Sequence, residues 1–127
     1  MIFIGGACPT QIDRALPGKH IKKVYDKLNH AQAAVLAQMR TGHSTLLSFL
    51  ARVKKVSSET CDCSRAPETV YHFLFECPKW DHLRGGIREK MANHFGNISL
   101  ALGGIGSDEK TLRECIQFAL ATKRLQL

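Results

Sequence analysis

A chain of 127 residues can form one domain with its own hydrophobic core, so it needs no metal or disulfide merely to fold. Its net charge of +7 favours an acidic partner, either nucleic acid or an anionic membrane surface. No apolar run approaches the roughly 20 residues that span a bilayer, which argues against a membrane span.

The cysteine count bears on the compartment. Five cysteines, an odd number and unevenly spread, argue against a disulfide framework and favour a reducing compartment inside the cell, the cytoplasm or the nucleus. The opening MIFIGGACPTQ has an apolar run without a preceding basic region, so a cleaved signal peptide is not expected. Secretion by an unrecognised route stays open.

The first third of the chain changes from irregular to helical. Residues 1–18 carry three glycines and two prolines without sustained periodicity and are predicted to be an irregular lead-in segment. From His20 to Leu28, apolar residues recur in steps of three and four, which is typical of one helix face. Residues 19–127 are predicted to form a single helical domain.

Two more helices are predicted before residue 56. Asn29 is suited to cap a helix over 30–40, and Gly42 is the kind of residue that ends one. Ser44 is suited to cap the next helix, over 45–55.

The second half begins with a turn-rich stretch over 56–69. A short helix is predicted from Pro67 or Glu68, and Pro78 is suited to the first turn of the next helix, over 79–95. Residues 96–107 are predicted to be a loop or a short extended piece. The last helix should start at Ser107 and bury Leu112, Cys115, Ile116, Ala119 and Leu120. With no convincing strand, the sequence predicts an all-α fold of about five helices.

The net charge is concentrated in residues 19–55. This segment has eight basic residues and one acidic residue, so it accounts for the whole charge of +7. We expect its basic side chains to contact phosphates, although a solvated helical face would carry the same pattern. They are Lys19, Lys22, Lys23, Lys27, Arg40, Arg52, Lys54 and Lys55.

Three cysteines and one histidine lie within the seventeen residues CDCSRAPETVYHFLFEC. Cys61, Cys63, His72 and Cys77 would make a closed tetrahedral shell for a structural zinc, with no position left for a substrate water. On an ideal helix the five-residue step from His72 to Cys77 turns the two side chains about 140° apart. The helix must therefore end or distort near Cys77, and Pro78 favours this because it disfavours the α conformation in the residue before it.

Other interpretations of this cluster stay open. Cys77 could be a buried cysteine at a helix end, and His72 could be a surface histidine. Cys61 and Cys63 could form a redox pair, although the usual redox spacing is Cys-x-x-Cys. His82 is a spare ligand, ranked below His72 because it lies beyond Pro78.

Catalysis is not expected. The His-x-Glu and Pro-Cys-x-x-Cys strings of zinc deaminases do not occur, and the GGIG at 103–106 lacks the lysine of a phosphate-binding loop. The sequence therefore predicts a protein that is not an enzyme and has no small-molecule substrate.

Several strings together resemble a known family: LPGKHIKKVYDKL, QAAVLAQMRTGHSTLLSFLARV, CDCSRAPETVYHFLFECPKWDHLR, LALGG and IQFALATKRL. They are similar to the C-terminal region of fungal non-LTR (LINE-type) retrotransposon polyproteins, the zinc-knuckle segment that follows the reverse transcriptase and RNase H domains. The resemblance covers roughly residues 16–125. It implies zinc ligands at Cys61, Cys63, His72 and Cys77, and it places the family's RTGH string at 40–43.

The resemblance also implies what is missing. The polymerase motif with paired aspartates has no counterpart, and the RNase H carboxylates would lie before residue 1. Two functions follow as hypotheses: a non-catalytic zinc module that binds RNA or DNA, or a protein-interaction module re-used by a host, for example as a fungal effector with a protein partner. A decayed fragment without a selected role is the third reading.

Overall fold

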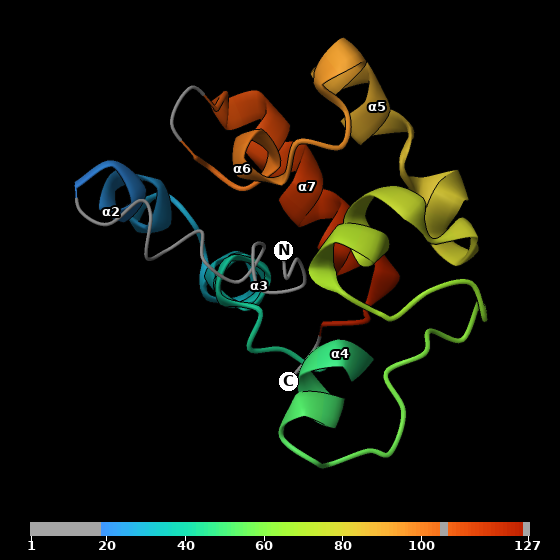
Figure 1. Cartoon of the computed structure of the whole chain (residues 1–127). Helices are drawn as coiled ribbons and strands as arrows, with labels where there is room; N and C mark the ends of the chain where they lie inside the picture. The colour runs from blue at the N-terminus through green and yellow to red at the C-terminus, as the bar shows by residue number, and fades with distance from the viewer. Residues whose placement is uncertain (1–18, 105–106, 126–127) are drawn as a thin grey trace.

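The computed structural model describes residues 19–104 and 107–125, and the predicted lead-in segment 1–18 lies outside them (Figure 1). Within those ranges the chain is mostly helical and contains no strand, which agrees with the all-α prediction. Thr60 and Pro67 form an isolated antiparallel β-bridge. No helix in the described ranges is both long enough and apolar enough to span a membrane.

The first helices form much as their patterns indicate. Helices α2 (Lys19–Asp26) and α3 (His30–Thr41) are separated by Asn29, which caps α3 in a reciprocal pair with Gln32. Gly42 ends α3 with a left-handed φ of 78°, a conformation that glycine adopts without steric cost.

Helix α4 (Leu47–Arg52) is shorter than the predicted 45–55. The hydroxyl of Ser44 accepts from the backbone N–H of Leu46, so Ser44 closes a turn before the helix instead of capping its first turn. The helix ends early because Lys54 takes a left-handed φ of 64°.

Short helical turns occupy the middle of the chain. A π-helical turn, η2 (His72–Glu76), comes first, and a 3₁₀ helix, η3 (Pro78–Leu83), follows with proline in its first turn as predicted. Two more follow, α5 (Gly85–Met91) and η4 (Ala92–His94).

The predicted helix over 79–95 is therefore divided, and the division falls at Arg84, beside two glycines of low helix propensity. The helix α5 packs against the C-terminal helix, and a side chain at Gly86 would displace the flexible carboxylate end of Glu114.

Helix α7 (Glu109–Thr122) lies at the centre of the structure (Figure 1). It packs against α3, α5, η3 and the short helix α6 (Ile98–Ala101), which forms where a loop or extended piece was predicted. The side chain of Asp108, not Ser107, caps it. Four of its five predicted inward residues are buried, and Leu120 is half-buried.

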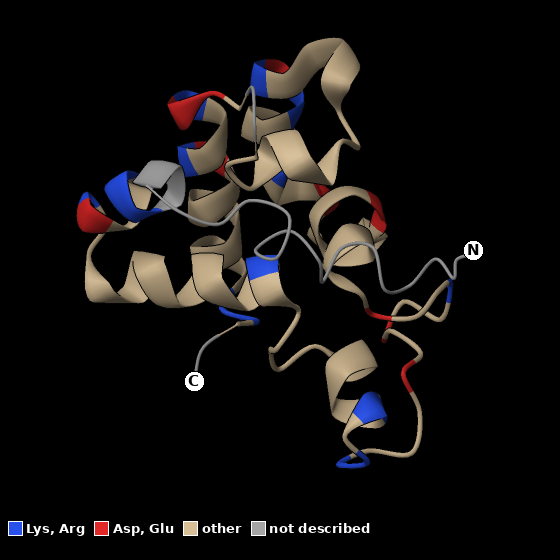
Figure 2. Ribbon diagram, turned by 60° about the vertical axis from the view of Figure 1, so that its left-hand side comes forward, with Lys and Arg blue, Asp and Glu red and all other residues tan. Residues whose placement is uncertain are grey.

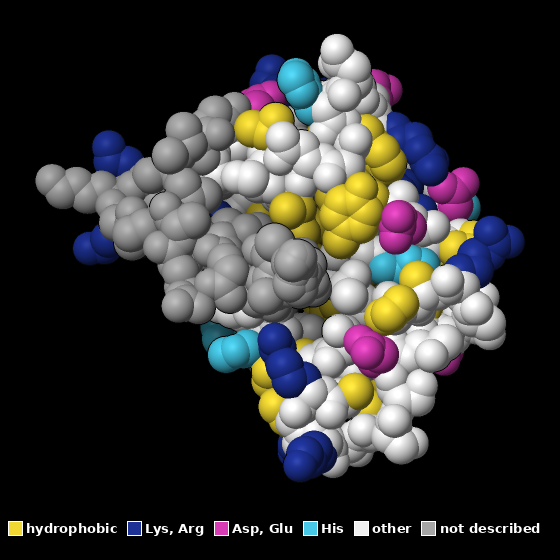
Figure 3. Space-filling model, in the orientation of Figure 1, with side chains coloured by type: hydrophobic (Ala, Val, Ile, Leu, Met, Phe, Trp, Pro, Cys, Tyr) yellow, Lys and Arg dark blue, Asp and Glu magenta, His cyan; other side chains and the backbone are white. Residues whose placement is uncertain are grey.

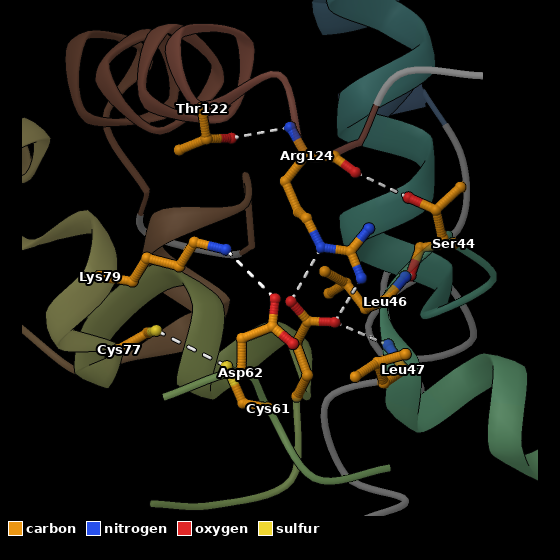
Figure 4. Close-up of polar contacts among 11 residues, drawn as sticks. Ser44, Leu46, Leu47, Cys61, Asp62, Cys77, Lys79, Thr122 and Arg124 are labelled. Carbon is orange, nitrogen blue, oxygen red and sulfur yellow. Dashed lines mark hydrogen bonds and ion pairs between the residues drawn. The ribbon is translucent and has the colours of Figure 1, made fainter. Parts of the chain in front are cut away.

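Glu68 ties the segment before η2 to two distant elements. Its buried carboxylate accepts from the backbone N–H of Leu47 at 2.8 Å, at the start of α4, and forms a two-pronged ion pair with Arg124 at 2.5 and 2.9 Å. Figure 4 shows Arg124 reaching from the end of α7 toward Leu47. Glu68 was expected to start a helix, but its backbone N–H pairs with the carbonyl of Glu59 instead.

Candidate metal centre

Two short segments bring the four predicted ligands together. Cys61 and Cys63 come from a tight turn, in which Ser64 donates its N–H to the carbonyl of Cys61 and Cys61 donates to that of Ala66. His72 and Cys77 come from the two ends of η2. Their ligand atoms all lie within 4.8 Å of one another, close enough to hold one metal ion.

A change of helical pitch makes the step from His72 to Cys77 possible. The backbone N–H of Cys77 donates to the carbonyl of His72 at 2.8 Å, a bond from residue i+5 to residue i that defines a π-turn. This bond brings residues five apart to the same side of the helix. Cys77 itself is extended, with φ −65° and ψ 119°, so the helix both distorts and ends where the spacing requires it.

One sulfur–sulfur distance in the group is close to that expected for tetrahedral zinc. The sulfurs of Cys61 and Cys77 lie 3.7 Å apart, whereas two thiolates on a tetrahedral zinc, each bound at about 2.3 Å, lie about 3.8 Å apart. Cys63 Sγ lies 3.2 Å from Nε2 of His72. Three sulfurs and one imidazole form a soft donor set that suits zinc better than magnesium or calcium.

The surroundings shift the pKa values of Cys61 and Cys63 in opposite directions. Burial raises the pKa of Cys61 to about 12, and the adjacent Cys77 adds to this rise. Burial also acts to raise the pKa of Cys63, but hydrogen bonds from the Arg65 backbone and the His72 side chain outweigh it and lower the pKa to about 7. A metal ion would have to displace the Cys61 proton, because thiols coordinate as thiolates.

Glu76 orients the histidine. Its carboxylate lies 3.4 Å from Nδ1 of His72, one helical turn away, while Nε2 faces the cysteines. A carboxylate on the outer nitrogen fixes the tautomer and ring direction of metal-binding histidines. The sequence spacing places Glu76 four residues after His72, and that signal could have identified this contact.

The side chain of Arg84 stabilises the π-turn η2 by hydrogen bonds to its backbone. Its guanidinium, almost wholly buried at 1% exposure, donates to the carbonyls of Phe73 and Leu74 at 3.0 and 2.8 Å and packs over the ring of Phe118. Two carbonyls in the middle of η2 thus gain donors from a side chain ten and eleven residues downstream. No sequence signal distinguishes Arg84 from the surface arginines.

The structure bears on the alternative interpretations of the cluster through the positions of His72, His82 and the thiols. His72 is buried at 3% exposure, so it is not a surface histidine, and His82 is exposed and lies outside the group of four. The sulfur of Cys61 lies 3.7 Å from that of Cys77 (Figure 4), and the thiols of Cys61, Cys63 and Cys77 are all free.

The chain is similar to a retrotransposon protein. Over 77 residues it is 34% identical to the "Retrovirus-related Pol polyprotein from type-1 retrotransposable element R1" of Bradysia coprophila. The matched stretch is 59% of this chain and 8% of that polyprotein. No family model and no solved structure matches the chain. The similarity and the group of four ligands together fit a region derived from a retrotransposon.

The predicted phosphate contacts divide into separate groups. Lys22 and Lys23 are exposed on α2 and Lys27 just after it, and Lys27 pairs with Glu109 at 3.2 Å. Another basic group, on and just after α4, lies at a different end of the molecule (Figure 2). It comprises Arg52, Lys54 and Lys55, all exposed. The side chain of Lys19 lies outside the described residues.

The prediction for Arg40 is wrong. It was expected to contact phosphate, but its side chain is fully buried at 0% exposure, and its guanidinium donates to the carbonyl of Leu102. A side chain in the core cannot reach a nucleic acid. Arg40 instead ties α3 to the end of α6.

Removal of one ligand tests the metal centre. We expect wild-type protein purified under reducing conditions to carry one equivalent of zinc, and Cys77→Ser to carry less than half, as measured by elemental analysis. Cys115→Ala is the matched control, because Cys115 is buried in the core outside the ligand group. This variant should bind as much zinc as the wild type. Structural zinc contributes on the order of 10 to 16 kcal/mol in small domains, so a chelator should unfold the 57–83 region. Less than half an equivalent in the wild type, without a change in melting on chelation, would contradict the site.

Loss of the Arg84 guanidinium tests the support of η2. We expect Arg84→Met to lower the free energy of unfolding of the zinc-loaded protein by about 3 kcal/mol, because buried carbonyls lose their donors. It should also weaken zinc binding in a chelator competition. Arg88→Met removes an exposed arginine that pairs with the same Asp81, and should cost less than about 1 kcal/mol. Equal effects of the two substitutions would show that Arg84 does not support the centre.

Proposed function

We propose that this chain is a non-catalytic, zinc-binding module that binds nucleic acid and derives from the region following RNase H in a non-LTR retrotransposon polyprotein of the fungal type. The observation that carries the proposal is the convergence of Cys61, Cys63, His72 and Cys77 on one point. Four protein ligands complete a tetrahedral shell, so a zinc ion there supplies rigidity and no open position for a substrate.

Zinc would fix the position of a basic surface. The turn that carries Cys61 and Cys63 is continuous with the segment that Glu68 ties to the start of α4. A metal that holds this turn against η2 therefore also limits the movement of α4. The exposed basic side chains on and just after α4 would then meet a phosphate backbone in a fixed arrangement, which lowers the entropic cost of binding.

The charge distribution supports nucleic acid as the partner. The basic group at α4 and that on α2 lie apart (Figure 2), so one nucleic acid would have to extend across the molecule to contact both. Phosphate contacts of this kind release counterions and make the affinity fall steeply with salt.

Charge removal at α4 tests this function. We expect the double variant Lys54→Gln, Lys55→Gln to bind labelled RNA or DNA more weakly at low salt and to reduce the slope of log affinity against log salt by about 1.5 to 2. Lys90→Gln, Lys110→Gln is the matched control: it removes the same charge from exposed positions on α5 and α7 and should leave the slope nearly unchanged.

Fluorescence anisotropy at several salt concentrations provides the measurement. If the wild-type protein binds RNA and DNA no more tightly than a neutral control protein does, the proposal that it binds nucleic acid is wrong. An equal loss in both double variants would place the contact surface away from α4.

A further inference from the structure

A cavity of about 360 Å³ lies between α4 and the segment that leads into η2. Its walls include Ser44, Ser48, Phe49 and Arg52 on one side and Glu59 and Thr69 on the other. The metal centre does not use it.

The charges around the cavity disfavour a phosphate. Glu59 and Glu68 both contribute to the lining, and a phosphate group would be repelled by them. The charge of Glu68 is compensated by its ion pair with Arg124, so Arg52 and Glu59 leave the lining close to neutral. A neutral polar group with donors and acceptors on its edge fits this lining better than an ion.

The shape of one wall favours a flat group. The Arg52 guanidinium lies over the Phe49 ring, 5.5 Å from its centre, and the exposed His43 ring packs against Phe49 with centroids 4.9 Å apart. Planar side chains of these types are the ones on which unpaired bases stack. Phe49 and Arg52 both line the cavity, so a flat ring inside it would meet planar partners.

Phosphates have partners just outside. Lys54 and Lys55 follow α4 directly and are exposed, as is Val53 at 44%. Figure 3 shows basic, hydrophobic and histidine side chains together at the end of the molecule where α4 lies. A base in the cavity would place its own backbone near these lysines.

We propose that the α4 cavity receives an unpaired nucleobase and makes the protein selective for single-stranded nucleic acid. This inference rests on the proposed nucleic-acid binding and names its substrate class. The base stacks on the Arg52 guanidinium, which the Phe49 ring supports, its edge faces Ser48 and Glu59, and its phosphates lie at the lysines. A base in a duplex is stacked and paired and cannot enter without the cost of unpairing.

The test uses the zinc-loaded full chain and short oligonucleotides of RNA and of DNA, each as a single strand and as a duplex, at one salt concentration. We expect the single strands to bind at least tenfold more tightly than the duplexes. Arg52→Lys keeps the charge but removes the planar face, and Phe49→Leu removes the aromatic ring. Each should weaken single-strand binding by about tenfold and leave duplex binding unchanged.

Two controls separate stacking from folding. Phe49→Tyr keeps the ring and should bind single strands as the wild type does. Arg52 is exposed, so Arg52→Lys should keep the wild-type melting temperature even if Phe49→Leu disturbs α4. A single strand carrying 2-aminopurine should lose fluorescence on binding to the wild type and less on binding to Arg52→Lys.

The outcomes distinguish the two proposals. Equal binding of single strands and duplexes, or an equal loss for both in Arg52→Lys, overturns the base cavity while nucleic-acid binding stands. Absence of binding to any of the oligonucleotides overturns both.

Discussion

The arrangement of the site depends on one backbone hydrogen bond, from the N–H of Cys77 to the carbonyl of His72. An α-helix would direct these two side chains about 140° apart, and no single ion could bind both. The wider turn closed by this bond places them together, and the extended conformation of Cys77 then ends the helix before Pro78. The tight turn carrying the other two cysteines can complete a four-ligand group only because the helix presents its pair in this way.

That hydrogen bond is held by groups on both sides. Arg84 supplies donors to carbonyls of the same turn, and Phe73 packs on Phe118 of α7 with ring centroids 5.2 Å apart. On the other side, Glu68 connects the preceding segment to α4 and to Arg124. The metal centre is thus attached to the central helix α7 and to α4, beside the basic group of Arg52, Lys54 and Lys55. Order at the centre can therefore influence the surface that we propose for nucleic acid.

Local patterns predicted the parts of this structure that local chemistry controls. The Asn29 cap, the Gly42 end and the inward face of α7 follow from capping and periodicity, and the spacing of the four ligands indicated both the metal group and the helix end at Cys77. Long-range packing decided the rest. Arg40 lies on a basic segment but is buried against the end of α6, and Arg84, between the two parts of a predicted helix, is buried against η2. Neither role can be recognised until the helices are placed in space.

The central claim is that one ion is bound by three sulfurs and one histidine nitrogen. X-ray absorption spectroscopy of the zinc-loaded protein tests it most directly, because zinc–sulfur and zinc–nitrogen distances differ by about 0.2 to 0.3 Å. We expect a shell of three sulfurs at about 2.3 Å and one nitrogen at about 2.0 Å from the zinc, with one sulfur lost in Cys77→Ser. A shell of nitrogen and oxygen atoms alone, or one that Cys77→Ser leaves unchanged, would contradict it.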